Sequence, residues 1–227
     1  MLLGLARSWL HLDRLRRSLL PVADETLHGV FEEAQRLLGV QRLGVGRLPK
    51  IAVSNKIPTP VAAGFFHPVV VLPAGALGAI NSDQLRDVLV HEMAHVLRGD
   101  HLVVLCQSIA KIVLWPIVFV HMLNRQLSIA REEVCDNYVL AGRDAVSYSE
   151  TLLRFAELSR RRRPISVWIG IMDWNGKLND RIAGLMDKRR DTMTRTNRLT
   201  AVATMGVFAV ATVIVCGTTF VDAQVDA

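Results

Sequence analysis

The segment His-Glu-Met-Ala-His at residues 91–95 constrains the fold of this chain more than any other feature. In an α-helix, residues four apart lie one above the other, so His91 and His95 would present two imidazoles to one point. A tetrahedral zinc ion requires two such ligands side by side. Glu92 would project about 100° round the helix from His91, where it can reach a water on the metal without being a ligand itself. The segment therefore predicts a zinc hydrolase site on a helix.

The flanking residues predict where this helix begins and ends. Ser82 is suited to the N-cap, and Asp83 in the first turn complements the positive end of the helix dipole. Gly99 directly after Arg98 is typical of a helix C-terminus. The apolar stripe expected to face the core comprises Leu85, Val88, Leu89, Val96 and Leu97. The alternative is a helix with two structural histidines and a solvated glutamate, but HExxH within a helix so clearly bounded favours the metal site.

A catalytic zinc site needs a third protein ligand, and residues 131–140 supply the strongest candidates. Glu132 and Asp136 are four residues apart, so both carboxylates share one face of a helix. One could bind the metal while the other orients a histidine. Glu133 lies three residues before Asp136 and could act nearly as well, so the spacing alone does not choose between the two glutamates. By itself this segment would be an ordinary charged surface helix.

Together these motifs resemble the BlaR/MecR-type membrane zinc metallopeptidases. The resemblance covers roughly residues 45–160 and rests on HEMAH, Arg98-Gly99-Asp100, Trp115-Pro116, Arg131-Glu132, Cys135-Asp136 and the run from Gly64 to Pro73. It implies a gluzincin, whose third zinc ligand is a glutamate four residues before an aspartate. The resemblance therefore implies Glu132, rather than Glu133, as the ligand that joins the two histidines in holding one catalytic Zn²⁺. It also implies Asp136 as the residue that orients a histidine.

The mechanism of that family matches the chemistry of these residues. Zinc makes a bound water more acidic and polarises the scissile carbonyl. Glu92 would take the proton of that water and pass it to the leaving amine. No residue stands out as the donor to the developing oxyanion, for which the sequence offers His67, His101, Tyr138 and Tyr148.

The apolar residues Val69, Val70 and Val71 are predicted to lie in an edge strand before the active-site helix. Prolines bracket this run at positions 68 and 73, and proline in a strand favours an edge. An edge strand can pair with the extended backbone of a peptide substrate. The alternative is an edge that the protein's own loops cover.

Residues 199–221 predict a transmembrane helix, because residues 201–221 carry no charge and about twenty residues match the hydrocarbon core. Basic residues crowd its N-terminal side, and the positive-inside rule then places residues 1–198 largely on the cytoplasmic side of the cell membrane. A short tail follows at 222–227. The alternative, a buried soluble helix, is disfavoured by this charge asymmetry.

A second apolar stretch, residues 102–123, is interrupted by Lys111 and Pro116. A full span, a bent hairpin and a buried helix pair all fit it. Because the histidines and the third ligand must meet on one side of a membrane, we favour a bent hairpin in or near the membrane. Residues 1–20 suggest an interfacial amphipathic segment or the end of a truncated transmembrane helix, and the metallopeptidase domain is predicted to span 21–198.

We therefore expect an α+β, mostly helical, zincin-like domain with a small edge sheet and a C-terminal transmembrane helix. The expected function is that of a membrane-associated zinc endopeptidase in regulated proteolysis or signal transduction. A non-catalytic signalling scaffold and a general quality-control metallopeptidase are the alternatives. Expected partners are a protein substrate such as a cytoplasmic regulator, membrane lipids, and either a sensor protein or a second copy. The formal charge of +6 and the basic run at 160–163 favour lipid headgroups over nucleic acid, for which no direct binding is expected.

Overall fold

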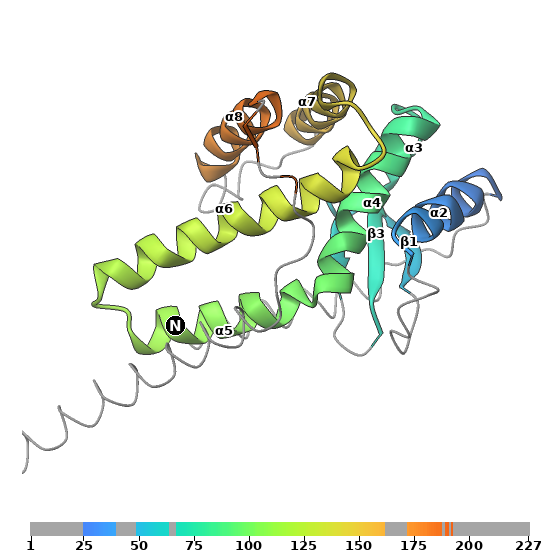
Figure 1. Cartoon of the computed structure of the whole chain (residues 1–227). Coiled ribbons are helices and arrows are strands. Elements are labelled where there is room, and N and C mark those ends of the chain that lie inside the picture. The colour runs from blue at the N-terminus through green and yellow to red at the C-terminus, as the bar shows by residue number, and fades with distance from the viewer. Residues whose placement is uncertain are drawn as a thin grey trace, which may run out of the picture. The chain divides into compact units, whose positions relative to one another are not determined.

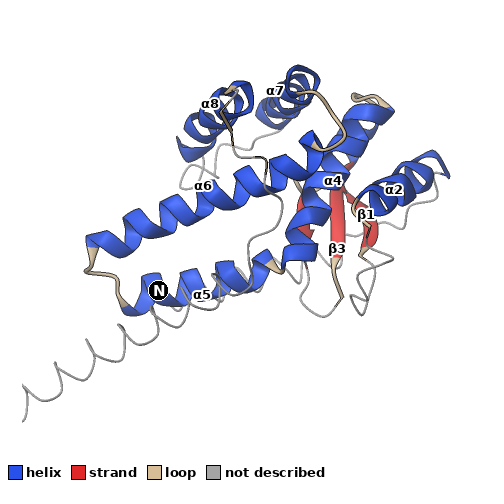
Figure 2. Cartoon of the chain, in the orientation of Figure 1, coloured by secondary structure: helices blue, strands red, loops and turns tan. Residues whose placement is uncertain are grey.

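The computed structural model describes residues 25–39, 49–63, 67–161, 172–187, 189–190 and 192. Its elements are α2 (Glu25–Leu37), β1 (Lys50–Ser54), β2 (Val61–Ala63), β3 (Val69–Pro73), α3 (Ala74–Leu77), α4 (Ser82–Arg98), α5 (Asp100–Val113), α6 (Val118–Leu140), α7 (Ala145–Arg161) and α8 (Met172–Met186) (Figure 1). The described part is mostly helical with one small sheet, as the sequence predicts (Figure 2). The segments predicted at 1–20, 199–221 and 222–227 lie outside the described residues.

The strand β3 is central in the sheet, so the prediction of an edge strand at Val69, Val70 and Val71 is wrong. The strand order is β1-β3-β2, in which β1 pairs with β3 in parallel and β2 pairs with β3 antiparallel. The continuous apolar run of β3 reflects burial of both its faces, which by itself does not tell a central strand from an edge strand. The prolines misled the prediction because Pro68 lies just before the strand and Pro73 is its last residue, where a missing N–H disturbs the ladder least.

The helix α4 lies at the centre of the described part and packs against α2, α6, α7 and the sheet. Its Leu89 and Met93 are fully buried and belong to one hydrophobic cluster with Phe31 of α2 and Leu72 of β3. Burial of a side chain of this size contributes about 1.5–3 kcal/mol to stability. The core therefore fixes the orientation of the helix that carries the two histidines.

The ends of α4 are set by Asn81 and Gly99. The N-cap is Asn81, one residue before the predicted Ser82: its Oδ1 accepts from the Gln84 N–H at 2.8 Å, while the Gln84 side chain accepts from the Asn81 N–H at 3.2 Å. This reciprocal capping box satisfies two of the amides that the first turn leaves without helical partners. At the other end Gly99 adopts φ 68°, which confirms the predicted stop and directs the chain into α5.

The helices α5 and α6 form a hairpin that brings the chain back to α4. After Gly99 the chain runs out along α5, turns at residues 114–117 and returns along α6 (Figure 1). The Arg131 guanidinium donates to the Gln107 side chain at 3.1 Å and joins the two helices. The C-terminal part of α6 coincides with the helix predicted at 131–140 and packs against α4. Among the described residues, no helix combines the length and the apolar character needed to cross a membrane.

Candidate metal centre

Side chains from α4 and α6 converge on one point where α6 packs against α4. His91 Nε2 lies 3.6 Å from one carboxylate oxygen of Glu132, and His95 Nε2 lies 3.9 Å from the other. The two imidazole rings are nearly perpendicular, with centroids 4.9 Å apart. One ligand atom from each of the three residues lies within 4.8 Å of the other two. The structure thus brings together the three predicted ligands, two imidazole nitrogens and a carboxylate oxygen.

Each imidazole is held through its other nitrogen by a buried carboxylate. Asp136 Oδ1 lies 3.1 Å from His91 Nδ1, and Asp100 Oδ2 lies 2.7 Å from His95 Nδ1. Both Nδ1 atoms are engaged in this way, so both Nε2 atoms face Glu132. A carboxylate on the far nitrogen is the usual arrangement for a histidine that binds zinc, because it fixes the ring and raises its basicity. The donor set and its carboxylate support therefore fit a catalytic zinc ion.

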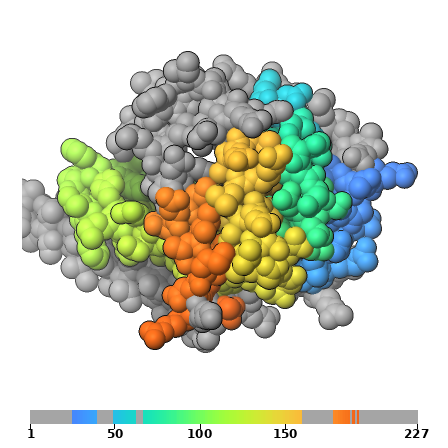
Figure 3. Space-filling view, turned by 90° about the horizontal axis from the view of Figure 1, so that it is seen from above, coloured from blue at the N-terminus to red at the C-terminus, as the bar shows by residue number. Residues whose placement is uncertain are grey.

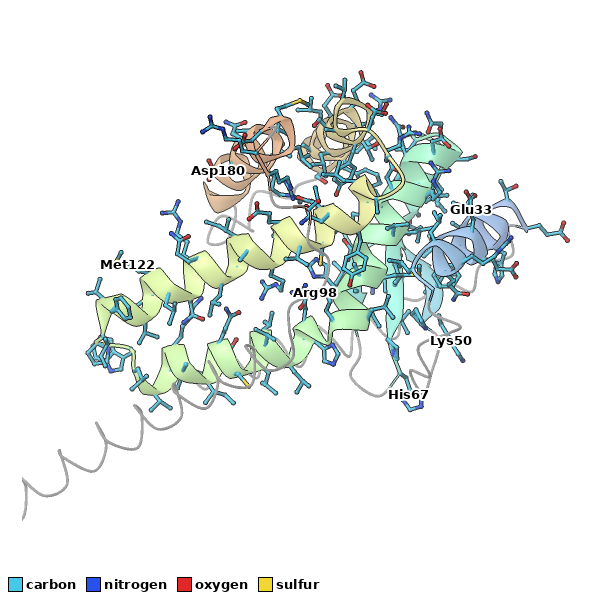
Figure 4. The ribbon with its side chains drawn as sticks, in the orientation of Figure 1. Glu33, Lys50, His67, Arg98, Met122 and Asp180 are labelled. Carbon is cyan, nitrogen blue, oxygen red and sulfur yellow. The ribbon has the colours of Figure 1, made fainter. Side chains whose placement is uncertain are left out.

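Sequence reasoning gave Asp100 no role, although a signal for one was present. Asp100 follows Gly99, and the left-handed turn at Gly99 redirects the chain at the end of α4. There the Asp100 carboxylate contacts His95 and accepts from the Arg98 Nε at 3.3 Å. Arg98 is labelled in Figure 4 at this junction of α4 and α5. A glycine that ends the HExxH helix, followed by an aspartate, could have pointed to this contact.

Two residues from later helices support Asp136, and neither was predicted to do so. The Tyr148 hydroxyl of α7 donates to Asp136 Oδ1 at 2.7 Å and lies 3.2 Å from His91 Nδ1. The Arg181 Nε of α8 donates to Asp136 Oδ2 at 3.1 Å, and its Nη1 lies 3.8 Å from Glu132. Tyr148 is fully buried on the Nδ1 side of His91, which places it among the supports of the site rather than beside a substrate.

The charges in this cluster stabilise one another. Burial raises the pKa of the Glu132 carboxyl, but its contacts with His91, His95 and Arg181 outweigh burial and lower this pKa to about 2. The pKa of Asp136 likewise lies well below its ordinary value, since His91 and Arg181 outweigh burial. Burial lowers the pKa of His91, while hydrogen bonds to Asp136 and Glu132 raise it, with a net rise to about 9. Without a metal, the cluster therefore holds a proton between two carboxylates, as a site built for a cation would.

The remaining residues of the site differ in exposure. Glu92 is half-buried next to His91, so part of its side chain reaches solvent. Glu133 is exposed and Glu132 is half-buried, and both line a pocket of about 240 Å³ between α6 and α8 together with Asp180 and Arg181. In the view from above, α8 lies against α7 (Figure 3).

Cys135 lies on the Nδ1 side of His95, away from the Nε2 atoms that face Glu132. Its buried Sγ lies 3.2 Å from His95 Nδ1 and 3.6 Å from Asp100 Oδ2. Burial, followed by the negative charge of Asp100, raises the pKa of the thiol, so it stays protonated at neutral pH. A protonated thiol beside Nδ1 is not a ligand for an ion held at the Nε2 atoms.

Comparison with known proteins places the chain in a family. The sequence model of the BlaR1 peptidase M56 family matches residues 1–185. The chain is 27% identical over 165 residues to Regulatory protein BlaR1 of Bacillus licheniformis, covering 71% of this chain and 26% of that protein. It is 31% identical over 108 residues to Protease HtpX homolog of Campylobacter concisus (strain 13826), covering 46% of this chain and 35% of that protein. The chain therefore spans only about a quarter to a third of the length of these curated relatives. The resemblance inferred from the motifs is confirmed: the chain belongs to the BlaR1 peptidase M56 family.

Proposed function

We propose that this protein is a membrane-associated, zinc-dependent endopeptidase. The observation that carries the proposal is the convergence of His91, His95 and Glu132, with one ligand atom from each within 4.8 Å of the others. Two imidazoles and one carboxylate leave room for a fourth position, which is the arrangement of catalytic rather than structural zinc. Asp136 and Asp100 would keep the two imidazoles in the tautomer and orientation that such a site needs.

The residues of α4 and α6 would divide the chemistry between them. His91, His95 and Glu132 would hold the zinc ion, which when bound supplies Lewis acidity to a scissile carbonyl and to a water. Glu92 adjoins His91 without belonging to the ligand set, and it would act as the general base that takes a proton from the attacking water. The same carboxyl group would then deliver that proton to the leaving amine nitrogen as the peptide bond breaks.

The substrate backbone would pair with β2 rather than with β3. β2 is an outer strand of the sheet, bonded only to β3 within the described chain, and it packs against α4. An extended peptide added to the free side of β2 would run past the helix that carries the histidines. This assigns to Val61–Ala63 the role that the sequence had suggested for Val69, Val70 and Val71.

The biological setting proposed is regulated proteolysis at the cytoplasmic face of the cell membrane. The relative that covers more of this chain is called a regulatory protein, which favours a protein substrate such as a cytoplasmic regulator. A sensor protein or a second copy of the chain would then supply the signal. The shorter match, to a protein called a protease, supports a second candidate, a membrane peptidase for protein quality control.

The first test is the zinc content of the full chain purified in detergent. We expect one zinc ion per wild-type chain, loss of zinc in Glu132→Ala and retention in Glu133→Ala, because Glu132 faces the imidazoles and Glu133 is exposed. Elemental analysis of the wild type and the two variants measures the number of zinc ions per chain. Equal loss in both variants would refute the ligand assignment, and a folded wild type that binds no added zinc would favour a non-catalytic scaffold.

The second test separates the base from the ligands. Glu92→Gln should retain zinc, because Glu92 is outside the ligand set, and should lose about 10²–10⁴-fold of the hydrolysis rate. Cleavage of an unfolded protein such as casein, measured beside zinc content, provides the readout. A zinc-loaded Glu92→Gln protein that is as active as wild type would show that another group is the base.

A further inference from the structure

The hairpin of α5 and α6 carries most of the exposed large apolar side chains of the described chain. Its tip, defined here as residues 113–122, has five that are between 57% and 71% exposed: Val113, Trp115, Val118, Phe119 and Met122. Met122 marks this end of the hairpin in Figure 4. Other exposed large apolar residues outside the hairpin, such as Leu37 and Leu153, are scattered singly. Single exposed residues are normal, whereas a continuous apolar patch marks a binding surface.

The charges of the hairpin indicate what this surface binds. Residues 101–131 contain no aspartate or glutamate. Exposed Lys111 and Arg125 lie within a helical turn of the two ends of the tip, one on each helix. Long basic side chains in such positions extend toward anionic headgroups while the neighbouring apolar residues enter the acyl region. Trp115, at the turn between the helices, is of the residue type enriched at the membrane–water interface.

Part of the backbone of the turn is bonded within the hairpin, although the amides of Trp115, Val118 and Phe119 have no acceptor among the described residues. The amides of Leu114 and Ile117 donate to carbonyls within the hairpin, and Pro116 has no amide to satisfy. The carbonyl of Trp115 lies 3.0 Å from His121 Nε2. Backbone groups without partners oppose entry into hydrocarbon, where no water can bond to them. These internal bonds reduce that opposition at the point that would enter first.

The shape of the patch favours lipid over a second protein chain. The exposed apolar residues lie on α5, on the turn and on α6, so the patch surrounds the tip instead of forming one face. A partner helix would need a single stripe, whereas a bilayer contacts all sides at once. The 14 residues of α5 extend about 21 Å, less than the roughly 30 Å of hydrocarbon in a bilayer.

We propose that the α5–α6 hairpin inserts tip first into one leaflet of an anionic bilayer without crossing it. Glu132 lies fourteen residues along α6 from Val118, about 21 Å at 1.5 Å per residue. Insertion would hold the metal centre close to the bilayer surface and restrict hydrolysis to peptide bonds near the membrane. That restriction rests on the proposed peptidase function, whereas insertion of the tip does not depend on it.

The test places a fluorescent label on the tip of the full chain in phosphatidylcholine vesicles with and without phosphatidylglycerol. Cys106 and Cys216 are replaced by alanine, and Phe119→Cys is labelled with the environment-sensitive dye NBD; Leu153→Cys on α7 is the matched control. We expect blue-shifted emission and quenching by doxyl-labelled lipid at position 119 only. Replacing Lys111 and Arg125 by glutamine should reduce this quenching in the anionic vesicles alone.

Three results would overturn the proposal. A label at position 119 that is quenched by aqueous iodide and not by doxyl lipid, as expected at position 153, would show that the tip stays in water. A label that neither quencher reaches, together with a disulfide between two unlabelled Phe119→Cys chains, would show that a second copy covers the tip. Unchanged quenching at position 119 in the glutamine variant would exclude a role for anionic headgroups. Far-UV circular dichroism reports folding in each variant and zinc content reports the metal site separately, so failure of insertion is distinguishable from failure of the metal site.

Discussion

At the scale of single residues, the proposed zinc site depends on two carboxylates outside the proposed ligand set. Asp136 and Asp100 each hold one imidazole, and both are buried. The two arrangements differ in their support: Asp136 is bonded to Tyr148 and Arg181, whereas Asp100 is bonded to Arg98. The two histidines therefore depend on different parts of the chain for their orientation.

Asp100→Asn should weaken zinc binding about 10–100-fold, the usual effect of losing a carboxylate behind a zinc-binding histidine. The amide retains the size of the side chain but no longer raises the basicity of His95 through Nδ1. Competition with a chromophoric zinc chelator measures the dissociation constant. Glu133→Gln, which removes an exposed carboxylate one residue from Glu132, is the matched control and should bind zinc as wild type does. Wild-type affinity in Asp100→Asn would show that the contact with His95 is merely structural.

At the scale of elements, the capping residues of α4 determine where the helix begins and ends, and its buried face determines how it packs on the core. Asn81→Ala should destabilise the protein by about 1 kcal/mol, because the Gln84 amide loses its acceptor in the first turn. Asn81→Ser, which restores an acceptor, should recover most of this loss. Chemical denaturation of the zinc-free protein measures the free energy of unfolding, and zinc stoichiometry should be unchanged in both variants. If Asn81→Ala and Asn81→Ser are equally unstable, the capping box is not the cause.

The sequence predicted single helices and strands better than it predicted which elements contact one another. The helix around His91 and its stop at Gly99 follow from spacing and from one glycine, both of which act within a few residues. The central position of β3 does not, because a strand's neighbours depend on pairing with β1 and β2 and not on its own composition. The contact of Arg181 with Asp136 joins residues 45 apart on different helices, and no periodicity within either helix encodes it.

At the scale of the whole molecule, the proposed metal centre joins helices that are separate in the sequence. His91 and His95 lie on α4, Glu132 lies on α6, and the hairpin between them must close before the ligands meet. Arg181 adds α8 to the same cluster through Asp136 and Glu132. A zinc ion that binds the folded state and not the unfolded chain would stabilise all of these helices together.

The stability of the zinc-free protein and the stabilisation added by zinc should therefore depend on pH in opposite ways. In the zinc-free protein the pKa of His91 is raised from 6.5 to about 9, so the stability it contributes is fully present below pH 6.5 and is lost as pH rises through 9. The pKa of Glu132 is lowered from 4.5 to about 2, so its contribution is present above pH 4.5 and is lost as pH falls through 2. The chelated protein should be most stable between these limits. Zinc requires a neutral His91, so its affinity should rise with pH until about 9.

Thermal unfolding in detergent at pH 6 and pH 9, with EDTA or with zinc, measures this directly. We expect the melting temperature with EDTA to fall between pH 6 and pH 9, corresponding to a loss of at most about 3 kcal/mol from His91 at 1.4 kcal/mol per pH unit. The stabilisation by zinc should grow over the same range. His91→Gln should remove most of both effects, because it deletes the group that exchanges a proton for the metal. A chelated protein that becomes more stable from pH 6 to pH 9 would show that His91 does not carry the proton between Asp136 and Glu132.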